Sequence, residues 1–174
     1  TAGDGGLKSR IGLRIAGAAS LVRPPSAPSR FLNDLTFSGY NARFTPAASE
    51  FDWLSRDPAE VEAYLRDPDC GEIMSARFFR ELARGIIRVS ARRAFEGVDH
   101  GTKLLLLSGT EDPVGGNGAG VREVAERYRR AGVQSVELRL YEGARHELLH
   151  ETNREEVVTE IAEHVDSWAA ACEN

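Results

Sequence analysis

The sequence has little cysteine and no long apolar run, and each shortage excludes a class of protein. Its 174 residues include two cysteines, Cys70 and Cys172. Two are too few for a disulfide framework, and their spacing is not that of a metal site. We therefore expect free thiols in a reducing, cytoplasmic setting. The longest clean apolar run, residues 104–107, is far shorter than the ~20 residues that cross a bilayer.

The chain also lacks a surplus of basic charge and an initiator methionine. Its net charge of −5 argues against nucleic acid as a partner. Thr1 is not a start residue, and no basic-then-apolar leader follows it, so we expect a processed or truncated N-terminus.

The charge is unevenly distributed along the chain. Residues 1–95 carry 14 Lys/Arg and 11 Asp/Glu, whereas residues 96–174 carry 8 and 16. This break coincides with a change from a helical pattern to alternating strands and helices. We therefore expect a helical region over residues 1–96 and an α/β region over residues 97–174.

Short helices are predicted throughout the first region. We expect them at residues 11–22, 31–37 and 59–66, the last with Asp57 as its cap and Pro58 in its first turn. A clearer helix spans residues 75–90. One of its sides is apolar, with Phe78, Phe79, Leu82, Ile86 and Val89.

The opposite side of that helix carries a stripe of arginines. The stripe consists of Arg77, Arg80, Arg84, Arg88 and Arg92, with Glu81 among them. Its ordinary interpretation is a solvated face with ion pairs. The alternative is a surface that makes transient contact with anionic lipid headgroups.

The second region predicts a parallel β-α-β unit. Residues 103–108 form an apolar strand of the kind buried on both faces, and residues 135–141 form a second strand. Between them lies a helix over residues 121–130 that ends at Ala131 and Gly132. Thr152 to Glu155 has the pattern of a capping box. It would begin a helix that covers the sheet with Val157, Val158, Ile161, Val165 and Trp168.

Each predicted strand ends next to a residue with acid–base chemistry. A right-handed crossover places the ends of both strands at one edge of the sheet, so Asp112 and His146 should lie side by side. A carboxylate and the imidazole that donates a hydrogen bond to it are two of the three members of a hydrolase triad. Two strands cannot close a core alone, so the fold class is α/β and the chain is expected to be part of a larger domain.

The residues around these two positions resemble a known family. Leu106 to Val114 resembles the acid turn of α/β-hydrolases, and Leu140 to Glu147 resembles their histidine turn. The similarity is greatest to bacterial monoacylglycerol lipases, lysophospholipases and serine aminopeptidases. Residues 51–58 and 67–71 are similar to the helical cap of that branch.

The resemblance implies a function for both regions. Residues 1–96 would be the cap, and residues 97–174 the last part of the hydrolase core. Asp112 would be the triad acid and His146 the general base, with no cofactor. Phe44, Phe51 and Trp53 of the cap, with Val114 of the acid turn, would line a pocket for a small acyl ester; ordinary cap core is the alternative interpretation of the three aromatics.

The nucleophile of that family is not found in this sequence. It lies in Gly-x-Ser-x-Gly, and no such pentapeptide occurs here. In the family the nucleophile precedes the cap, so we expect it before Thr1 and expect the chain alone to be inactive. A non-catalytic remnant or interaction domain is therefore one alternative.

Three further patterns suggest other chemistry. His146-Glu147-Leu148-Leu149-His150 matches the zinc-peptidase signature, which requires both histidines on one helical face. A strand before the motif and a new helix start after it argue against that interpretation. Residues 115–120 are rich in glycine but fit no phosphate-binding motif, which favours a plain turn. Cys70 is predicted to be a buried thiol rather than a nucleophile.

Overall fold

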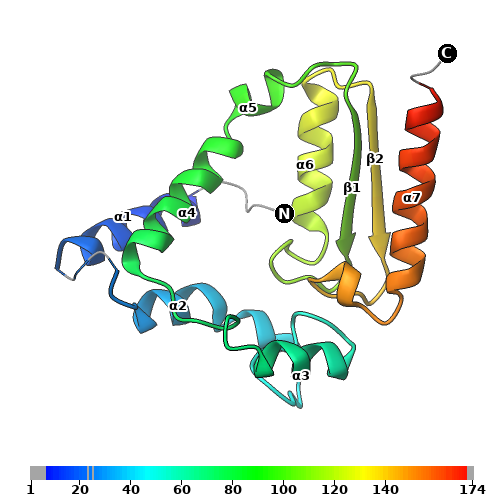
Figure 1. Cartoon of the computed structure of the whole chain (residues 1–174). Coiled ribbons are helices and arrows are strands. Elements are labelled where there is room, and N and C mark those ends of the chain that lie inside the picture. The colour runs from blue at the N-terminus through cyan, green and yellow to red at the C-terminus, as the bar shows by residue number, and fades with distance from the viewer. Residues whose placement is uncertain (1–6, 23, 25, 172–174) are drawn as a thin grey trace.

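The computed structural model describes residues 7–22, 24 and 26–171, and begins in a helical arm (Figure 1). The arm contains α1 (Leu7–Val22), α2 (Arg30–Phe37), the 3-10 helix η1 (Tyr40–Arg43), α3 (Pro58–Arg66), α4 (Ala76–Val89) and α5 (Arg92–Glu96). The helices predicted at 11–22, 31–37, 59–66 and 75–90 are thus present, with small changes at their ends.

An α/β unit follows the arm. It contains β1 (Lys103–Gly109), α6 (Ala119–Arg130), β2 (Ser135–Tyr141), the 3-10 helix η2 (Leu148–His150) and α7 (Arg154–Ala170). The two strands are parallel, with Lys103 opposite Ser135 and Gly109 opposite Tyr141. The strands lie between α6 and α7 (Figure 1), so the unit has the layered α/β architecture that the sequence predicted.

Side-chain caps explain where α3 and α4 begin. The Asp57 carboxylate accepts a hydrogen bond from the Ala59 amide, and Pro58 occupies the first turn. The Ser75 hydroxyl accepts one from the Phe78 amide.

The predicted capping box at the start of α7 is wrong. The residue before the helix is Asn153, not Thr152, and its side chain caps no amide. The Asn153 carboxamide is instead committed to other side chains, because its Oδ1 accepts from Arg56 and its Nδ2 donates to Glu156.

Burial of the first strand differs from the prediction. Residues 104–107 are half-buried rather than buried on both faces. The reason is that β1 pairs with β2 alone, and no other strand in the described part of the chain covers its second edge. Apolar strand residues become fully buried only when neighbours cover both faces and both edges.

Helix α4 packs on α1 and α2 through a small apolar core. Its buried members are Ala16, Leu32, Ala76 and Phe79. The rest of the predicted apolar side is not covered, since Phe78, Leu82 and Val89 are 42%, 40% and 54% exposed. In α7, likewise, Val157 is buried whereas Val158 and Val165 are exposed.

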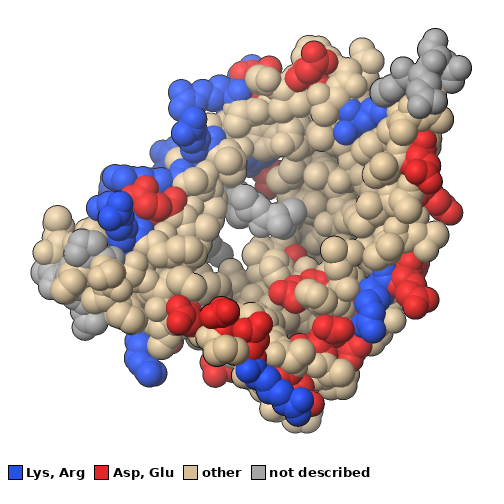
Figure 2. Space-filling view, viewed as in Figure 1, with Lys and Arg blue, Asp and Glu red and all other residues tan. Residues whose placement is uncertain are grey.

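The arginine side of α4 forms surface ion pairs. Glu81 contacts Arg80 at 3.0 Å and Arg84 at 2.9 Å. Basic side chains gather over α4 and α5, while acidic ones predominate over α3 and α7 (Figure 2). The stripe thus has the exposed arginines and ion pairs that the ordinary interpretation expects, while contact with anionic lipid headgroups stays a prediction. None of the described helices has the length and apolar character needed to cross a membrane.

The α1–α4 core generates a stability prediction. Phe79 is 6% exposed and packs beside Phe37, whose ring centroid lies 6.2 Å away. We expect Phe79→Ala to lower the free energy of unfolding by about 3–5 kcal/mol in a urea titration. Phe78→Ala is the matched control, because its ring is 42% exposed and its loss should cost far less. Equal losses would contradict this packing.

Candidate functional site

The turns that follow β1 and β2 are held together by backbone hydrogen bonds. The Thr110 amide donates to the Tyr141 carbonyl at 3.0 Å, and the Glu111 amide donates to the Ala144 carbonyl at 3.0 Å. The Thr110 hydroxyl accepts from the Gly143 amide at 2.8 Å. These bonds continue the parallel pairing beyond the strands and place both turns at one edge of the sheet.

Glycine at position 109 makes this close approach feasible. A Cβ atom there would lie 1.9 Å from the Ala144 carbonyl oxygen, far inside van der Waals contact. In the facing turn, Gly143 has a φ of +68°, which L-residues with side chains rarely adopt. The two turns therefore meet backbone to backbone.

Asp112 and His146 are brought into hydrogen-bonding contact by these turns. The distance between His146 Nδ1 and Asp112 Oδ1 is 3.0 Å. Asp112 is buried, whereas the His146 side chain is 32% exposed. With Nδ1 donating to the carboxylate, Nε2 is available as a proton acceptor, and no protein group within residues 7–22, 24 and 26–171 bonds to it.

The environment of Asp112 favours its ionised form. Burial alone raises the pKa of this carboxyl, but the hydrogen bond and charge of His146 and the amides of Val114 and Gly115 outweigh it. The net pKa is therefore below the ordinary value. Nearby, burial first and the Asp112 charge second raise the pKa of Tyr40.

The four residues predicted to bind substrate lie in one cluster. Phe44 and Trp53 are buried in it with Leu54, and Phe51 and Val114 pack against them. The Trp53 ring also contacts the His146 ring, with centroids 5.2 Å apart. The cluster therefore joins the arm to the site, and its most buried rings, Phe44 and Trp53, present little surface to a ligand.

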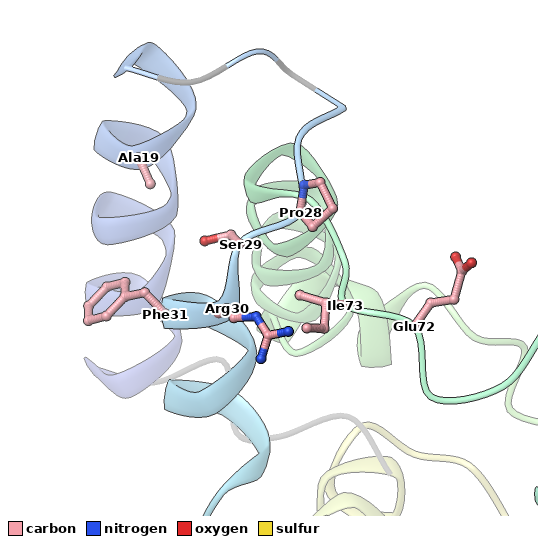
Figure 3. Close-up of a pocket in the computed structure, with 7 residues that line it drawn as sticks. All are labelled: Ala19, Pro28, Ser29, Arg30, Phe31, Glu72 and Ile73. Atoms are coloured by element: carbon pink, nitrogen blue, oxygen red, sulfur yellow. The ribbon is translucent and has the colours of Figure 1, made fainter. Parts of the chain in front are cut away.

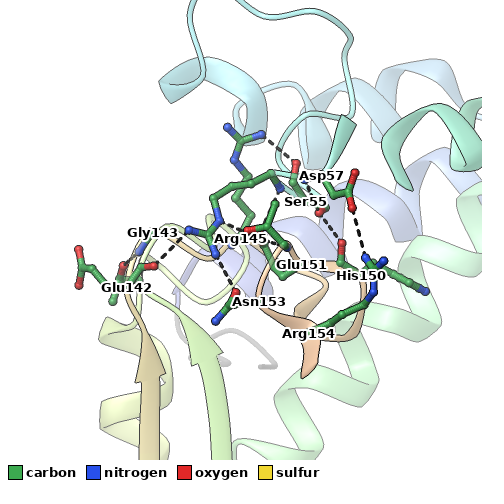
Figure 4. A network of polar contacts seen from close by, with 12 residues as sticks. Ser55, Asp57, Glu142, Gly143, Arg145, His150, Glu151, Asn153 and Arg154 are labelled. Atoms are coloured by element: carbon green, nitrogen blue, oxygen red, sulfur yellow. Dashed lines mark hydrogen bonds and ion pairs between the residues drawn. The ribbon is translucent and has the colours of Figure 1, made fainter. Parts of the chain in front are cut away.

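A second set of contacts around the histidine turn has no signal in the sequence. The backbone carbonyls of Trp53 and Leu54 accept from the amides of His146 and Glu147. A buried carboxylate, Glu151, bonds to both segments (Figure 4). Partners 95 residues apart, such as Arg56 and Glu151, follow no local pattern that could have revealed them.

The geometry opposes the zinc-peptidase interpretation. His146 lies in a bend, and only the last three residues of the motif form helical structure, η2. His150 is exposed, and its Nδ1 lies 2.8 Å from the Glu147 carboxylate. The two histidines thus do not share one face of a continuous helix, as the zinc signature requires.

The thiol and the glycine-rich loop show no catalytic arrangement. Cys70 is half-buried; partial burial first and the charge of Asp67 next raise the pKa of its thiol, which disfavours the nucleophilic thiolate. Cys172 lies outside the described residues. The loop after Asp112 is closed by its own backbone, since the Asn117 amide donates to the Asp112 carbonyl and the Gly120 amide to the Gly115 carbonyl.

A cavity of about 800 Å³ lies elsewhere, between α1, the start of α2 and the segment before α4 (Figure 3). It is lined by Ala19, Pro28, Ser29, Arg30, Phe31, Glu72 and Ile73. Among its polar lining residues, Arg30 and Glu72 are exposed and Ser29 is buried. Neither Asp112 nor His146 borders the cavity.

The contact at Gly109 generates a test of the site's geometry. We expect Gly109→Ala to separate the two turns and to lower the free energy of unfolding by about 1–3 kcal/mol or more. The control is Gly85→Ala, where no atom lies within 4 Å of the added Cβ. That helical substitution should stabilise by up to ~1 kcal/mol. Urea titrations of both variants check this, and equal effects would contradict the backbone contact.

The lowered pKa of Asp112 predicts how stability depends on pH. A depressed folded-state pKa contributes stability that is present above the unfolded value of about 3.9 and is lost as the pH falls through the folded value. Asp112→Asn should therefore destabilise the protein at neutral pH, with the difference shrinking in acid. Urea titrations across this range check it against Asp34→Asn, an exposed control. A constant difference would contradict the prediction.

Comparison with solved structures gives the wider relationship. The chain is similar to a thermostable carboxyl esterase from Bacillus coagulans in complex with glycerol, with a TM-score of 0.79, 20% identity, and coverage of 95% of this chain and 53% of that one. It is similar to a lipase in an open form, with a TM-score of 0.78, 32% identity, and coverage of 88% and 50%. A monoacylglycerol lipase from Paleococcus ferrophilus has a TM-score of 0.56, 21% identity, and coverage of 90% and 65%.

The chain thus spans about half the length of the first two of these relatives. The sequence matches no curated protein. Residues 12–153 match the family described as serine aminopeptidase, S33, over well more than half of the chain. This match and the shared fold confirm the resemblance seen in the sequence: the chain belongs to the serine aminopeptidase S33 family of α/β-hydrolases.

Proposed function

We propose that this chain supplies the acid and the base of a serine hydrolase that cleaves carboxylic esters. The observation that carries the proposal is the 3.0 Å contact between Asp112 and His146 at the ends of neighbouring parallel strands. The relatives support the ester chemistry, since they are described as a carboxyl esterase and lipases. Acylglycerols or lysophospholipids are the proposed substrates.

Each residue has a defined role in the proposed reaction. A serine hydroxyl attacks the ester carbonyl, and its proton passes to Nε2 of His146. The imidazolium then donates this proton to the leaving alcohol, while Asp112 holds the ring in the required tautomer. Acid–base catalysis of this kind contributes typically ~10²–10⁴-fold. In the second half of the reaction water attacks the acyl-enzyme, His146 Nε2 takes a proton from this water, and the imidazolium then donates it to the departing serine oxygen as the carboxylic acid is released.

The proposed serine lies outside this chain, in a Gly-x-Ser-x-Gly segment that precedes it. The sequence contains no such motif, and no described serine hydroxyl bonds to the His146 ring. The helical region, residues 1–96, would form the cap over the assembled site. Phe51 and Val114, at the half-buried border of the aromatic cluster, would contact the acyl chain, with Phe44 and Trp53 supporting them.

The test is made on the protein expressed from the gene with its upstream codons. We expect a fluorophosphonate to label one serine and expect the enzyme to hydrolyse short-chain monoacylglycerols. Asp112→Asn should lower kcat by on the order of 10⁴-fold because a neutral amide, with a donor in place of one oxygen, replaces the carboxylate that fixes the tautomer and stabilises the imidazolium. His146→Gln should be at least as severe, because it removes the base.

The matched control is His164→Gln, which breaks a different histidine–carboxylate contact. His164 Nε2, in α7, lies 3.2 Å from Glu137, which lies within β2 rather than in either turn. Its loss should leave kcat unchanged. An unlabelled protein whose gene has its start codon near Thr1 would instead identify a non-catalytic remnant. Faster cleavage of amides than of esters would overturn the substrate class.

A further inference from the structure

We propose that Glu151 is a positioning residue, whose buried carboxylate links the histidine turn to Arg56 of the arm and so orients His146 toward Asp112. The proposal deepens the proposed function, on which it rests for the role of His146. The contacts themselves do not depend on the serine.

The Glu151 carboxylate is fully buried and saturated with donors. Its Oε1 accepts from the amides of Arg145 at 2.8 Å and Arg56 at 3.1 Å. Its Oε2 accepts from Arg56 Nε at 2.7 Å and from the Thr152 amide at 3.1 Å. The residue is 0% exposed. A buried carboxylate with donors on both oxygens has a single low-energy orientation, so it can act as a rigid link.

One side of this link is directly next to the proposed base. The Arg145 amide precedes His146 by one residue, so the bond to Glu151 restrains the backbone that carries the imidazole. The Arg145 side chain points elsewhere: its guanidinium lies 4.0 Å from the Phe44 ring centroid and donates to the carbonyls of Ser55 and Asp52.

The other side of the link is the arm. Arg56 bonds to Glu151 through both its amide and its guanidinium, and its Nη2 donates to Asn153 at 2.8 Å (Figure 4). The Ser55 hydroxyl donates to the His150 carbonyl at 2.6 Å. The arm therefore contacts the segment that directly follows the histidine turn at His150, Glu151 and Asn153.

The arm also contacts His146 itself. The His146 amide donates to the Trp53 carbonyl at 3.3 Å, and the Glu147 amide donates to the Leu54 carbonyl at 2.8 Å. The Trp53 ring packs on the His146 ring. A shift of the arm would therefore displace the backbone of His146 and the Trp53 ring that packs on its imidazole. The buried Glu151 carboxylate opposes such a shift.

Glu151→Gln tests the link, because an amide replaces one acceptor oxygen with a donor that faces Arg56 Nε and the Thr152 amide. The readout is the His146 Nδ1 proton in NMR spectra of the 174-residue chain. We expect its exchange with water to become about tenfold faster, while the amide spectrum of β1 and β2 stays that of the folded protein. Asp112→Ala, which removes the acceptor, identifies the resonance.

The matched control is Glu160→Gln. Glu160 is also a carboxylate with two side-chain partners, Arg139 Nε at 2.6 Å and the Tyr141 hydroxyl at 2.7 Å, but both partners lie in β2 and neither is within residues 145–147, which carry the imidazole. Its loss should change stability without changing the His146 proton. If Glu151 had only a structural role, Glu151→Gln would likewise change stability and leave the exchange of the His146 proton unchanged.

A second pair of variants keeps the test decisive if Glu151→Gln does not fold. Arg56→Ala removes the guanidinium that bonds to Glu151 Oε2 and keeps the amide that bonds to Oε1, and we expect exchange of the His146 proton to become faster in this variant too. Its control, Arg154→Ala, breaks another contact between arm and core, the pairs with Asp57 at 3.2 Å and Glu60 at 3.4 Å. The proposal is overturned if the His146 proton in Arg56→Ala, or in a folded Glu151→Gln, exchanges as in the unmodified chain.

Activity of the protein with its upstream segment separates this proposal from the proposed function. Faster exchange with no serine labelling would support positioning and refute the hydrolase. Unchanged exchange in a labelled, active enzyme would do the reverse. If both proposals hold, Glu151→Gln should lower kcat about tenfold or more with little change in KM, since the base is displaced but the acyl site is not.

Discussion

The arrangement of this site depends on the backbone contact between the turns that follow the two parallel strands. Gly109 lies against the Ala144 carbonyl with no room for a side chain. Parallel strands deliver both turns to one edge of the sheet, and the missing Cβ lets them approach closely enough for Asp112 to reach His146. The acid–base pair is thus a consequence of backbone packing, which explains how two residues 34 positions apart meet.

A second layer of contacts gives the pair its orientation. The arm contributes carbonyls to the histidine turn, a tryptophan ring to the imidazole, and Arg56 to the buried Glu151. The segment between η1 and α3 contacts both the backbone and the ring of His146, so a change in the position of the arm would change the geometry of this residue.

Several features could be predicted from local sequence because their physical causes are local. Asp57 and Ser75 cap their helices by accepting hydrogen bonds from amides two or three residues away, and Pro58 occupies the first turn of α3. The apolar strand and the elements next to it are visible in the sequence as runs or regular repeats of apolar residues. The errors about burial had a common origin. The apolar faces of α4 and α7 and the strand at 104–107 were expected to be buried, but periodicity shows which side chains share a face, not whether another element covers it.

The sequence by itself determined the order of the elements, the α/β class, and which carboxylate and histidine meet, Asp112 and His146. Strand patterns and the crossover rule are enough for this, because they place the ends of the strands without reference to side-chain packing. Only the tertiary structure decided that the zinc-like motif is not one helix and that Glu151 links the arm to the histidine turn. Both depend on groups that are distant in sequence or on backbone conformation, and such contacts leave no periodic trace in the chain.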